Sequence, residues 1–184
     1  KVGCFFNYDL EPEQPNTLPL QKVPCNILGL EYREIKPEIK FNPHRRPYKK
    51  YVAIAPHSTA GLKHWNNETG WQEVVDYLVK QGYEVRLLST EKDGTRGNRN
   101  PKGITLQEPG PLKKLVKVLQ ESEFFIGISS GLSWMSWALG TKTIMISGFS
   151  YPYTEFSDCI RISNDNPNVC GGCFNRHWLN PGDW

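Results

Sequence analysis

The chain contains no apolar run long enough to cross a membrane, and no signal peptide stands at its start. It also has little net charge, because 22 Lys and Arg against 19 Asp and Glu leave +3, too little to indicate a nucleic-acid-binding protein. Neither GxGxxG nor GxxxxGK[ST] occurs, so the sequence supports neither a dinucleotide-dependent oxidoreductase nor a P-loop NTPase. We therefore expect a cytoplasmic protein with no membrane span and no nucleic-acid partner.

The first fifty residues differ from the rest in being rich in proline. The chain begins at Lys1 and not at Met, so we expect it to be a piece of a longer protein. Two short apolar stretches, Val2–Phe6 and Asn26–Leu30, are candidate strands. The basic run 44–50 is interpreted as a solvated linker ahead of the next strand.

From residue 51 onward, apolar strand patterns alternate with helical ones. Expected strands are Tyr51–Ala55, Glu84–Leu88, Phe124–Ile128 and Thr143–Ile146, and expected helices cover residues 70–81, 112–119 and 132–139. Thr69 and Gln72 form a capping-box pattern before the first helix, and Gly82 and Gly140 stand where helices should end. This alternation predicts an α/β fold: a Rossmann-like, doubly wound parallel sheet.

The stretch Phe124–Ser150 carries the clearest functional signal. Ser129, Ser130 and Gly131 separate a buried strand from an apolar helix that begins at about Leu132. Free backbone N–H groups at such a helix start form an anion site, best suited to phosphate. An ordinary strand–helix crossover without a ligand explains the same pattern, and the geometry alone does not separate the two interpretations.

Two other loops are expected at the same edge of the sheet, because ligands of such sheets bind outside the carboxyl ends of the strands. The first offers Ser58 and Thr59 as hydrogen-bond donors and Lys63 as a cation for a diphosphate. The second offers Glu91, whose carboxylate is a candidate acceptor for ribose hydroxyls, although a solvated charged loop is the plainer interpretation. The loop histidines His57 and His64 are assigned no catalytic role.

Read together, these segments resemble a known enzyme family. The pair PHSTAGLKHWNNETGWQEVVDYL and FFIGISSGLSWMSWALGTKTIMISGF is similar to the C-terminal half of GT-B glycosyltransferases that use ADP-heptose, such as lipopolysaccharide heptosyltransferases. The order of ISSGLSW, SWA, MISGF, Glu155-Phe156 and a CxxC resembles the bacterial autotransporter heptosyltransferases more closely. The resemblance extends over nearly the whole chain, from about residue 2 to residue 184.

The resemblance implies a donor-binding domain of an enzyme that transfers heptose from ADP-heptose to serine hydroxyls of an autotransporter adhesin. It places backbone N–H groups of Ser130, Gly131 and Leu132 on the diphosphate, with Lys63 and the hydroxyls before it alongside. The general base is expected in an N-terminal domain, so no catalytic residue is assigned here and the chain alone is expected to bind donor without transferring it. Ser129 stands where the lipopolysaccharide enzymes carry Asp.

The cysteines pose a separate question. Cys170 and Cys173 form a CxxC that fits half of a tetrahedral Cys₄ site, and a redox pair is disfavoured because two glycines between the cysteines argue against a helix there. The resemblance implies iron, or zinc, with two further cysteines beyond the chain. Cys4, Cys25 and Cys159 are expected to be small buried residues in strand-like surroundings.

These patterns divide the chain into a Pro-rich entry segment (1–50), a Rossmann-like core (51–163) and the start of a metal knuckle (164–184). Trp134 and Trp137, three residues apart, are expected to pack on one face of a buried helix. Homo-oligomerisation is expected for the full-length protein. The alternative functions are a non-catalytic nucleotide-sugar-binding module, a lipopolysaccharide-type heptosyltransferase domain and an interaction domain built on the CxxC and the basic run.

Overall fold

A six-stranded parallel sheet forms the centre of the computed structural model, which describes residues 15–40, 48–89, 94, 98–108, 110–164, 166 and 168–176. The strand order is β3-β2-β1-β4-β5-β6. The strands are β1 (Tyr51–Ala55), β2 (Glu84–Leu88), β3 (Thr105–Gln107), β4 (Phe125–Ile128), β5 (Thr143–Ile146) and β6 (Ile160–Ile162). Every pair is parallel. The order reverses between β1 and β4, which is the topological switch point of a doubly wound sheet.

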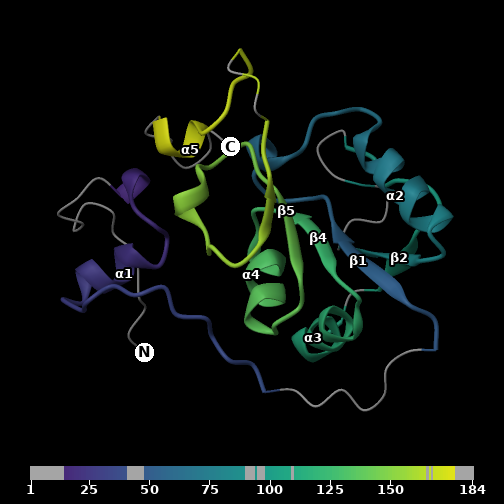
Figure 1. Ribbon diagram of the computed structural model, residues 1–184, viewed down its shortest axis with the longest axis horizontal. Coiled ribbons are helices and arrows are strands. Elements are labelled where there is room, and N and C mark those ends of the chain that lie inside the picture. Colours follow the sequence, from purple (N-terminus) through teal and green to yellow (C-terminus); the bar gives the residue numbers. More distant parts are fainter. Residues whose placement is uncertain are drawn as a thin grey trace.

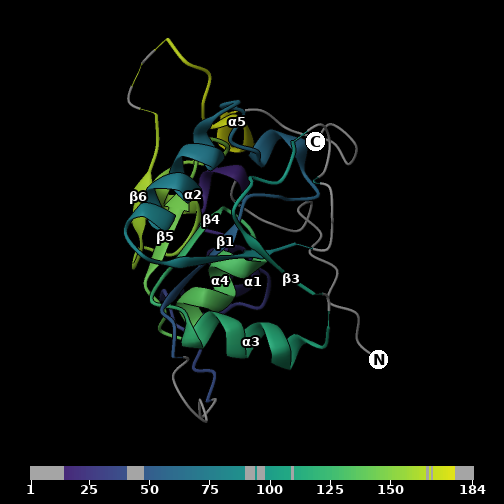
Figure 2. The ribbon, with the colours of Figure 1, turned by 90° about the vertical axis from the view of Figure 1, so that its right-hand side faces the viewer.

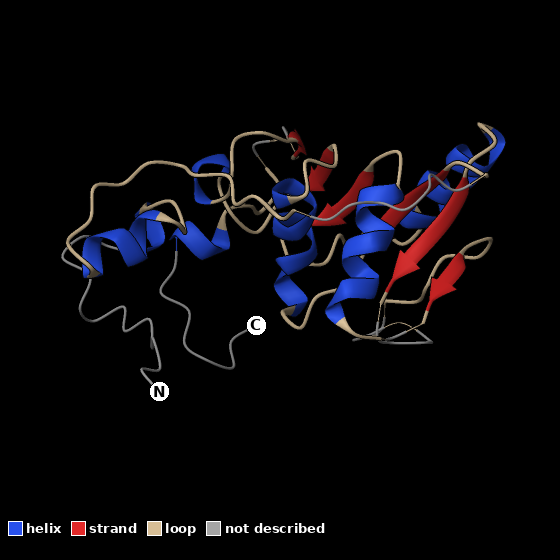
Figure 3. Ribbon diagram, turned by 90° about the horizontal axis from the view of Figure 1, so that it is seen from below, coloured by secondary structure: helices blue, strands red, loops and turns tan. Residues whose placement is uncertain are grey.

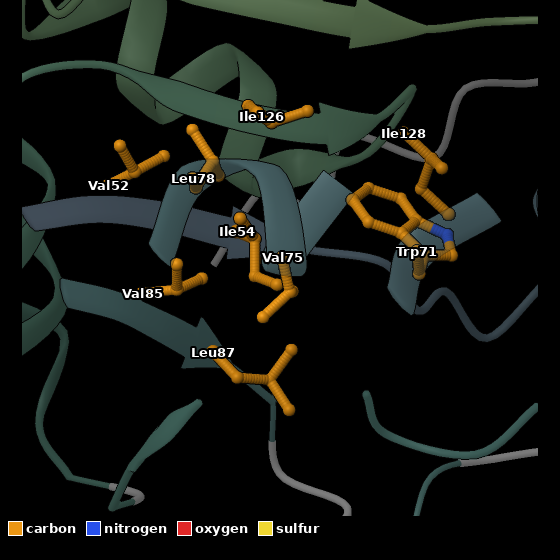
Figure 4. Packing of buried hydrophobic residues seen from close by; sticks show 9 residues of the cluster. All are labelled: Val52, Ile54, Trp71, Val75, Leu78, Val85, Leu87, Ile126 and Ile128. Atoms are coloured by element: carbon orange, nitrogen blue, oxygen red, sulfur yellow. The ribbon is translucent and has the colours of Figure 1, made fainter. Parts of the chain in front are cut away.

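Helices cover both faces of the sheet (Figure 1). On one face, α2 (Gly70–Lys80) packs Trp71, Val75 and Leu78 against isoleucine and valine side chains of the central strands (Figure 4). On the other face lie α3 (Leu112–Glu121) and α4 (Gly131–Ala138). Burial of β1 and β4 on both faces explains why their sequences are continuously apolar and not alternating.

The predicted elements of the core agree closely with the structure. β1, β2 and β5 have the predicted bounds, and the helix before Gly140 begins at Gly131, one residue earlier than predicted. Gly82 and Gly140 end their helices with φ of 86° and 75°, a conformation that favours glycine. β3 was missed because its three residues lie at the sheet edge and two of them are polar.

Two local predictions are wrong. Asn26–Leu30 is not a strand: residues Lys22–Ile27 form helix α1, which ends in a turn where Leu30 N donates to Cys25 O (2.8 Å). Cys25 is therefore helical and only partly buried. The capping box at Thr69 does not form either, because Asn67 Oδ1 accepts from the N–H groups of Thr69 and Gly70 while Gln72 bonds the backbone of Lys102.

The N-terminal segment lies beside the sheet on the β6 side, at the left of Figures 1 and 3. Leu20 N donates to Thr154 O (2.8 Å), and the Glu34 carboxylate accepts from Ser157 N and Oγ. Val2–Phe6 lies outside the described residues, and the division of the chain at residues 50 and 163 stays a prediction. None of the described helices is long and apolar enough to cross a membrane.

Candidate functional site

The loops that follow β1 and β4 flank the switch point at the carboxyl edge of the sheet. In the β1 loop, Lys63 ends the short 3-10 helix Gly61–Lys63. In the β4 loop, Ser129 and Ser130 lead directly into α4. Because β1 and β4 are hydrogen-bonded neighbours, the two loops that the sequence singled out start side by side. This edge is where doubly wound sheets bind their ligands.

The turn after β4 presents unused hydrogen-bond donors. Ser130, the residue before α4, is extended, and Gly131 is exposed with open space around its Cβ position. In the described part of the chain, no backbone hydrogen bond is donated by Gly131 N or Leu132 N, as expected for the first N–H groups of a helix. The Ser130 hydroxyl is buried and makes no hydrogen bond with any described residue. This hydroxyl is therefore available to an acceptor outside the described residues, whether a ligand or a water molecule.

The loop after β1 is held by aromatic and imidazole contacts. Trp65 packs edge-on against Trp71 (ring centroids 5.7 Å apart) and lies where a side chain at position 70 would be, which explains the glycine there. His64 Nδ1 accepts from the Asn98 amide (2.7 Å), so its Nε2–H donates to Ser58 O (2.9 Å). His64 therefore braces the loop from within.

Lys63 is half-buried and has no ion pair within the described residues. Its Nζ lies 5.7 Å from the centre of the Phe149 ring. Burial lowers the pKa of the Lys63 ammonium below its usual value, and the nearby Glu155 carboxylate opposes that shift. A desolvated lysine that still lacks a direct anionic partner is suited to binding an anionic ligand.

Glu155 is the group that the sequence reasoning missed. The sequence analysis uses it only as part of the Glu155-Phe156 motif of the family resemblance. In the structure the residue is buried (4% exposed) at the same edge of the sheet. Oε1 accepts hydrogen bonds from the hydroxyls of Ser129 (2.5 Å) and Ser150. Oε2 lies 3.0 Å from Arg161 Nη1 in an ion pair and accepts no hydrogen bond from a described residue. The available signal was an acidic residue within an otherwise apolar and hydroxyl-rich stretch.

Of the three remaining predicted donor-site residues, the structure describes two. Ser58 lies in the β1 loop and accepts a hydrogen bond from Ala60 N through its Oγ (3.2 Å). Thr59 is exposed in the same loop. Glu91 lies outside the described residues, so its predicted place near a ribose stays a prediction.

The CxxC lies against the loop that follows β5. Cys170 Sγ and Cys173 Sγ are 3.5 Å apart, close to the ~3.8 Å expected for two thiolates on one tetrahedral ion. Cys173 begins the short helix α5 (Cys173–Arg176), so the expectation of no helix here is wrong at the second cysteine. Gly172 N donates to Gly148 O (2.8 Å) and Phe174 N to Phe149 O (3.0 Å). α5 lies at the top of Figure 2, far from α3.

A complete metal site is not found among the described residues, where no group of three or more His, Cys, Asp or Glu side chains converges. Cys25 and Cys159 are partly buried and stand apart from the CxxC as thiols without a disulfide, while Cys4 lies outside the described residues. Two thiols at ligand spacing therefore fit half of a metal site and no more.

Comparisons with known proteins agree with this geometry. The family described as glycosyltransferase family 9 (heptosyltransferase) matches residues 20–164. Autotransporter heptosyltransferase Aah of Escherichia coli is 38% identical over 183 residues, which cover 96% of this chain and 46% of Aah. BimC of Burkholderia thailandensis, described as an inactive autotransporter heptosyltransferase, is 27% identical, covering 90% of this chain and 40% of BimC.

Solved structures of TibC from enterotoxigenic E. coli H10407 share the fold. An iron-containing dodecameric glycosyltransferase structure of TibC gives a TM-score of 0.84 at 34% identity, covering 93% of this chain and 46% of TibC. A TibC complex with ADP-D-beta-D-heptose gives 0.85 at 34% identity, covering 95% and 46%. The predicted fold class is thus confirmed, and the chain spans about half the length of the relatives it matches.

Proposed function

This chain belongs to glycosyltransferase family 9, and from that premise we propose that it is the donor-binding domain of an enzyme that transfers heptose from ADP-heptose to serine hydroxyls of an autotransporter adhesin. The observation that carries the proposal is that the loop of Lys63 and the Ser129–Leu132 turn follow two neighbouring strands, β1 and β4, at the switch point of the sheet. The names of Aah and TibC, and the ADP-heptose in a TibC structure, support the donor and the acceptor class.

In this proposal the ADP diphosphate lies at the N-terminus of α4. Gly131 N and Leu132 N donate to phosphate oxygens, and the Ser130 hydroxyl finds there the acceptor it lacks within the chain. Lys63 approaches from the β1 loop and neutralises charge that develops on ADP as the sugar departs. Ser58 and Thr59 supply further donors, and Glu91 accepts from the ribose.

No catalytic residue is assigned to this chain, and the general base is proposed to lie in a part of the enzyme outside it. Like TibC, which is described as dodecameric, the full-length protein is proposed to be a homo-oligomer. A cytoplasmic location is proposed, since the acceptor adhesin would be modified before export.

A substitution at Gly131 should separate ligand binding from folding. A valine Cβ at this position meets no atom within 4 Å, so we expect Gly131→Val to change the free energy of unfolding by less than about 1 kcal/mol. The added side chain would occupy the space through which phosphate approaches the backbone, so ADP binding should weaken at least about tenfold. Isothermal titration with ADP and urea unfolding measure the two effects. Normal ADP binding by the variant would show that the phosphate does not bind at this turn.

A second candidate function is a non-catalytic nucleotide-sugar-binding module. It is favoured by one finding, the relative BimC that is described as inactive. Both functions require ADP-heptose binding, but only the first requires transfer. Incubating the full-length protein with ADP-heptose and an autotransporter passenger domain, followed by mass spectrometry of the passenger, distinguishes them.

We also propose that Cys170 and Cys173 hold an iron or zinc ion together with two cysteines beyond this chain. Their Sγ separation and the iron in TibC support this, and tetrathiolate sites suit either metal. The bound ion would tie α5 to the loop after β5, which it already contacts through Gly172 and Phe174.

The metal proposal predicts a difference in metal content between two lengths of the protein. The full-length protein should contain about one iron or zinc per chain, whereas residues 1–184 alone should retain little, because two thiolates leave half of the tetrahedron open. Elemental analysis measures both, with Cys170→Ser as the variant that should lose the metal and Cys159→Ser as the matched control that should keep it. A stoichiometric ion in residues 1–184 would show that other side chains complete the site.

A further inference from the structure

We propose that Glu155 is a positioning residue for the donor diphosphate: its buried carboxylate holds the Ser129 turn by a hydrogen bond and places a negative charge near the Lys63 ammonium. This inference rests on the proposed function, since it names a residue that acts on the same site without touching the donor.

Glu155 connects the loops that end three strands. Through Oε1 it accepts from Ser129 Oγ, directly after β4, and from Ser150 Oγ, in the loop after β5. It also acts electrostatically on Lys63, in the loop after β1. One carboxylate thus bonds the segments after β4 and β5 and acts through its charge on the segment after β1.

The Glu155 carboxylate is buried, so its negative charge must be compensated by neighbouring positive charges. A carboxylate with 4% exposure is costly to bury unless its charge is compensated. Arg161 of β6 supplies an ion pair at 3.0 Å, and Lys63 adds a second positive charge. The Glu155 carboxylate also acts electrostatically on the thiol of Cys159, whose pKa is raised mainly by burial. The cluster of Lys63, Glu155 and Arg161 carries a net charge of +1 and lies beside the positive end of α4, which suits a diphosphate.

Glu155 also favours the charged, protonated form of Lys63. Burial favours the neutral amine of Lys63, and the Glu155 carboxylate favours the ammonium. Only the ammonium can neutralise phosphate charge. Removal of the carboxylate should therefore lower the pKa of Lys63, so that its ammonium loses its proton at a lower pH.

The charge-removing variant Glu155→Gln gives a test whose sign is decisive. If Glu155 were only a negative charge near an anion site, its removal would tighten ADP binding, because Coulomb repulsion would fall. If Glu155 positions the turn and Lys63, ADP binding should weaken about tenfold at neutral pH, the effect of losing a charge-assisted hydrogen bond. Asp158→Asn is the matched control, since this carboxylate in the same segment is exposed and, among the described residues, pairs with the surface residue Lys36; it should leave ADP affinity unchanged.

The pH dependence of ADP affinity separates positioning from a purely structural role. Isothermal titration of the full-length protein between neutral and alkaline pH should show affinity falling as Lys63 loses its proton, and in Glu155→Gln the fall should occur at lower pH. Lys63→Arg should flatten both profiles, because arginine stays charged throughout. Tighter binding by Glu155→Gln, or a fall at the same pH as in the wild type, would overturn the proposal.

Two further measurements keep the proposal testable. If Glu155→Gln does not fold, Ser129→Ala removes only the hydroxyl that Glu155 holds, and it should weaken ADP binding severalfold; unchanged affinity would overturn the link. If the wild type binds no ADP, the proposed function fails separately. NMR titration of ¹³C-methylated lysines, with the Lys63 signal assigned by its loss in Lys63→Arg, then tests the role of Glu155 without ADP. The pH at which Lys63 is half-protonated must still be lower in Glu155→Gln than in the wild type.

Discussion

Replacing Lys63 with alanine should weaken ADP binding by about 1.5–3 kcal/mol, which is roughly ten- to a hundredfold or more. Lys63 is half-buried, and no anion is within ion-pair distance of it in the described structure, so its ammonium is free to pair with a diphosphate. Loss of that partner leaves phosphate charge uncompensated at a site where water screens it poorly. Isothermal titration with ADP measures the change.

The matched control for this prediction is Lys80→Ala. Lys80 is exposed in the last turn of α2, so its removal lowers the net charge equally without touching the site, and ADP affinity should stay within about twofold of the wild type. Equal losses in both variants would indicate a general charge effect. An unchanged affinity in Lys63→Ala would remove Lys63 from the donor site.

Replacing Phe156 with alanine should lower the free energy of unfolding by about 3–5 kcal/mol, a large part of the total stability of a domain. Phe156 is 1% exposed, stacks on Trp137 with ring centroids 4.7 Å apart, and meets Trp134 edge-on at 5.0 Å. The cavity would open between α4 and the loop that carries Glu155, where the three rings and Met145 share one cluster. Urea unfolding followed by circular dichroism measures the loss.

Tyr153→Ala is the control for Phe156→Ala, because it removes an aromatic ring of similar size from the same loop at a position that is 44% exposed. It should cost about 1 kcal/mol or less. A small effect of Phe156→Ala would contradict the structural role that both the sequence and the structure assign to Trp134 and Trp137.

The elements of the core were predictable because their signals are local. A strand buried on both faces must be continuously apolar, so Tyr51–Ala55 was placed without error. Thr143–Ile146 was also placed without error, because its residues are β-branched or bulky, although only alternate residues are fully buried. α2 was readable from apolar residues at helical spacing, since one stripe of it faces the sheet. The prediction failed at β3 and α1, where short elements owe their form to neighbours distant in sequence and not to a periodic pattern.

Some residues of the candidate site were likewise predictable from local sequence signals, and one was not. Ser129, Gly131 and Lys63 could be selected from the sequence because turns after strands of a parallel sheet converge on one edge, whatever their separation along the chain. Glu155 was not selected, because its contact with Ser129 depends on the packing of the segment after β5, which no turn directly after a strand specifies. The family resemblance, carried by short motifs in a constant order, is confirmed by the match over residues 20–164.

The sequence by itself therefore determined the fold class, the family and the two loops that follow β1 and β4, since hydrophobic period, glycine positions and the alternation of strand and helix patterns are local features of the chain. Only the tertiary structure decided that a buried carboxylate accepts a hydrogen bond from Ser129, pairs with Arg161 and acts electrostatically on Lys63. It also decided that the CxxC rests on the loop after β5. Such contacts depend on distances between side chains that no local pattern specifies, because a charge can be buried only where the fold brings its partners to it.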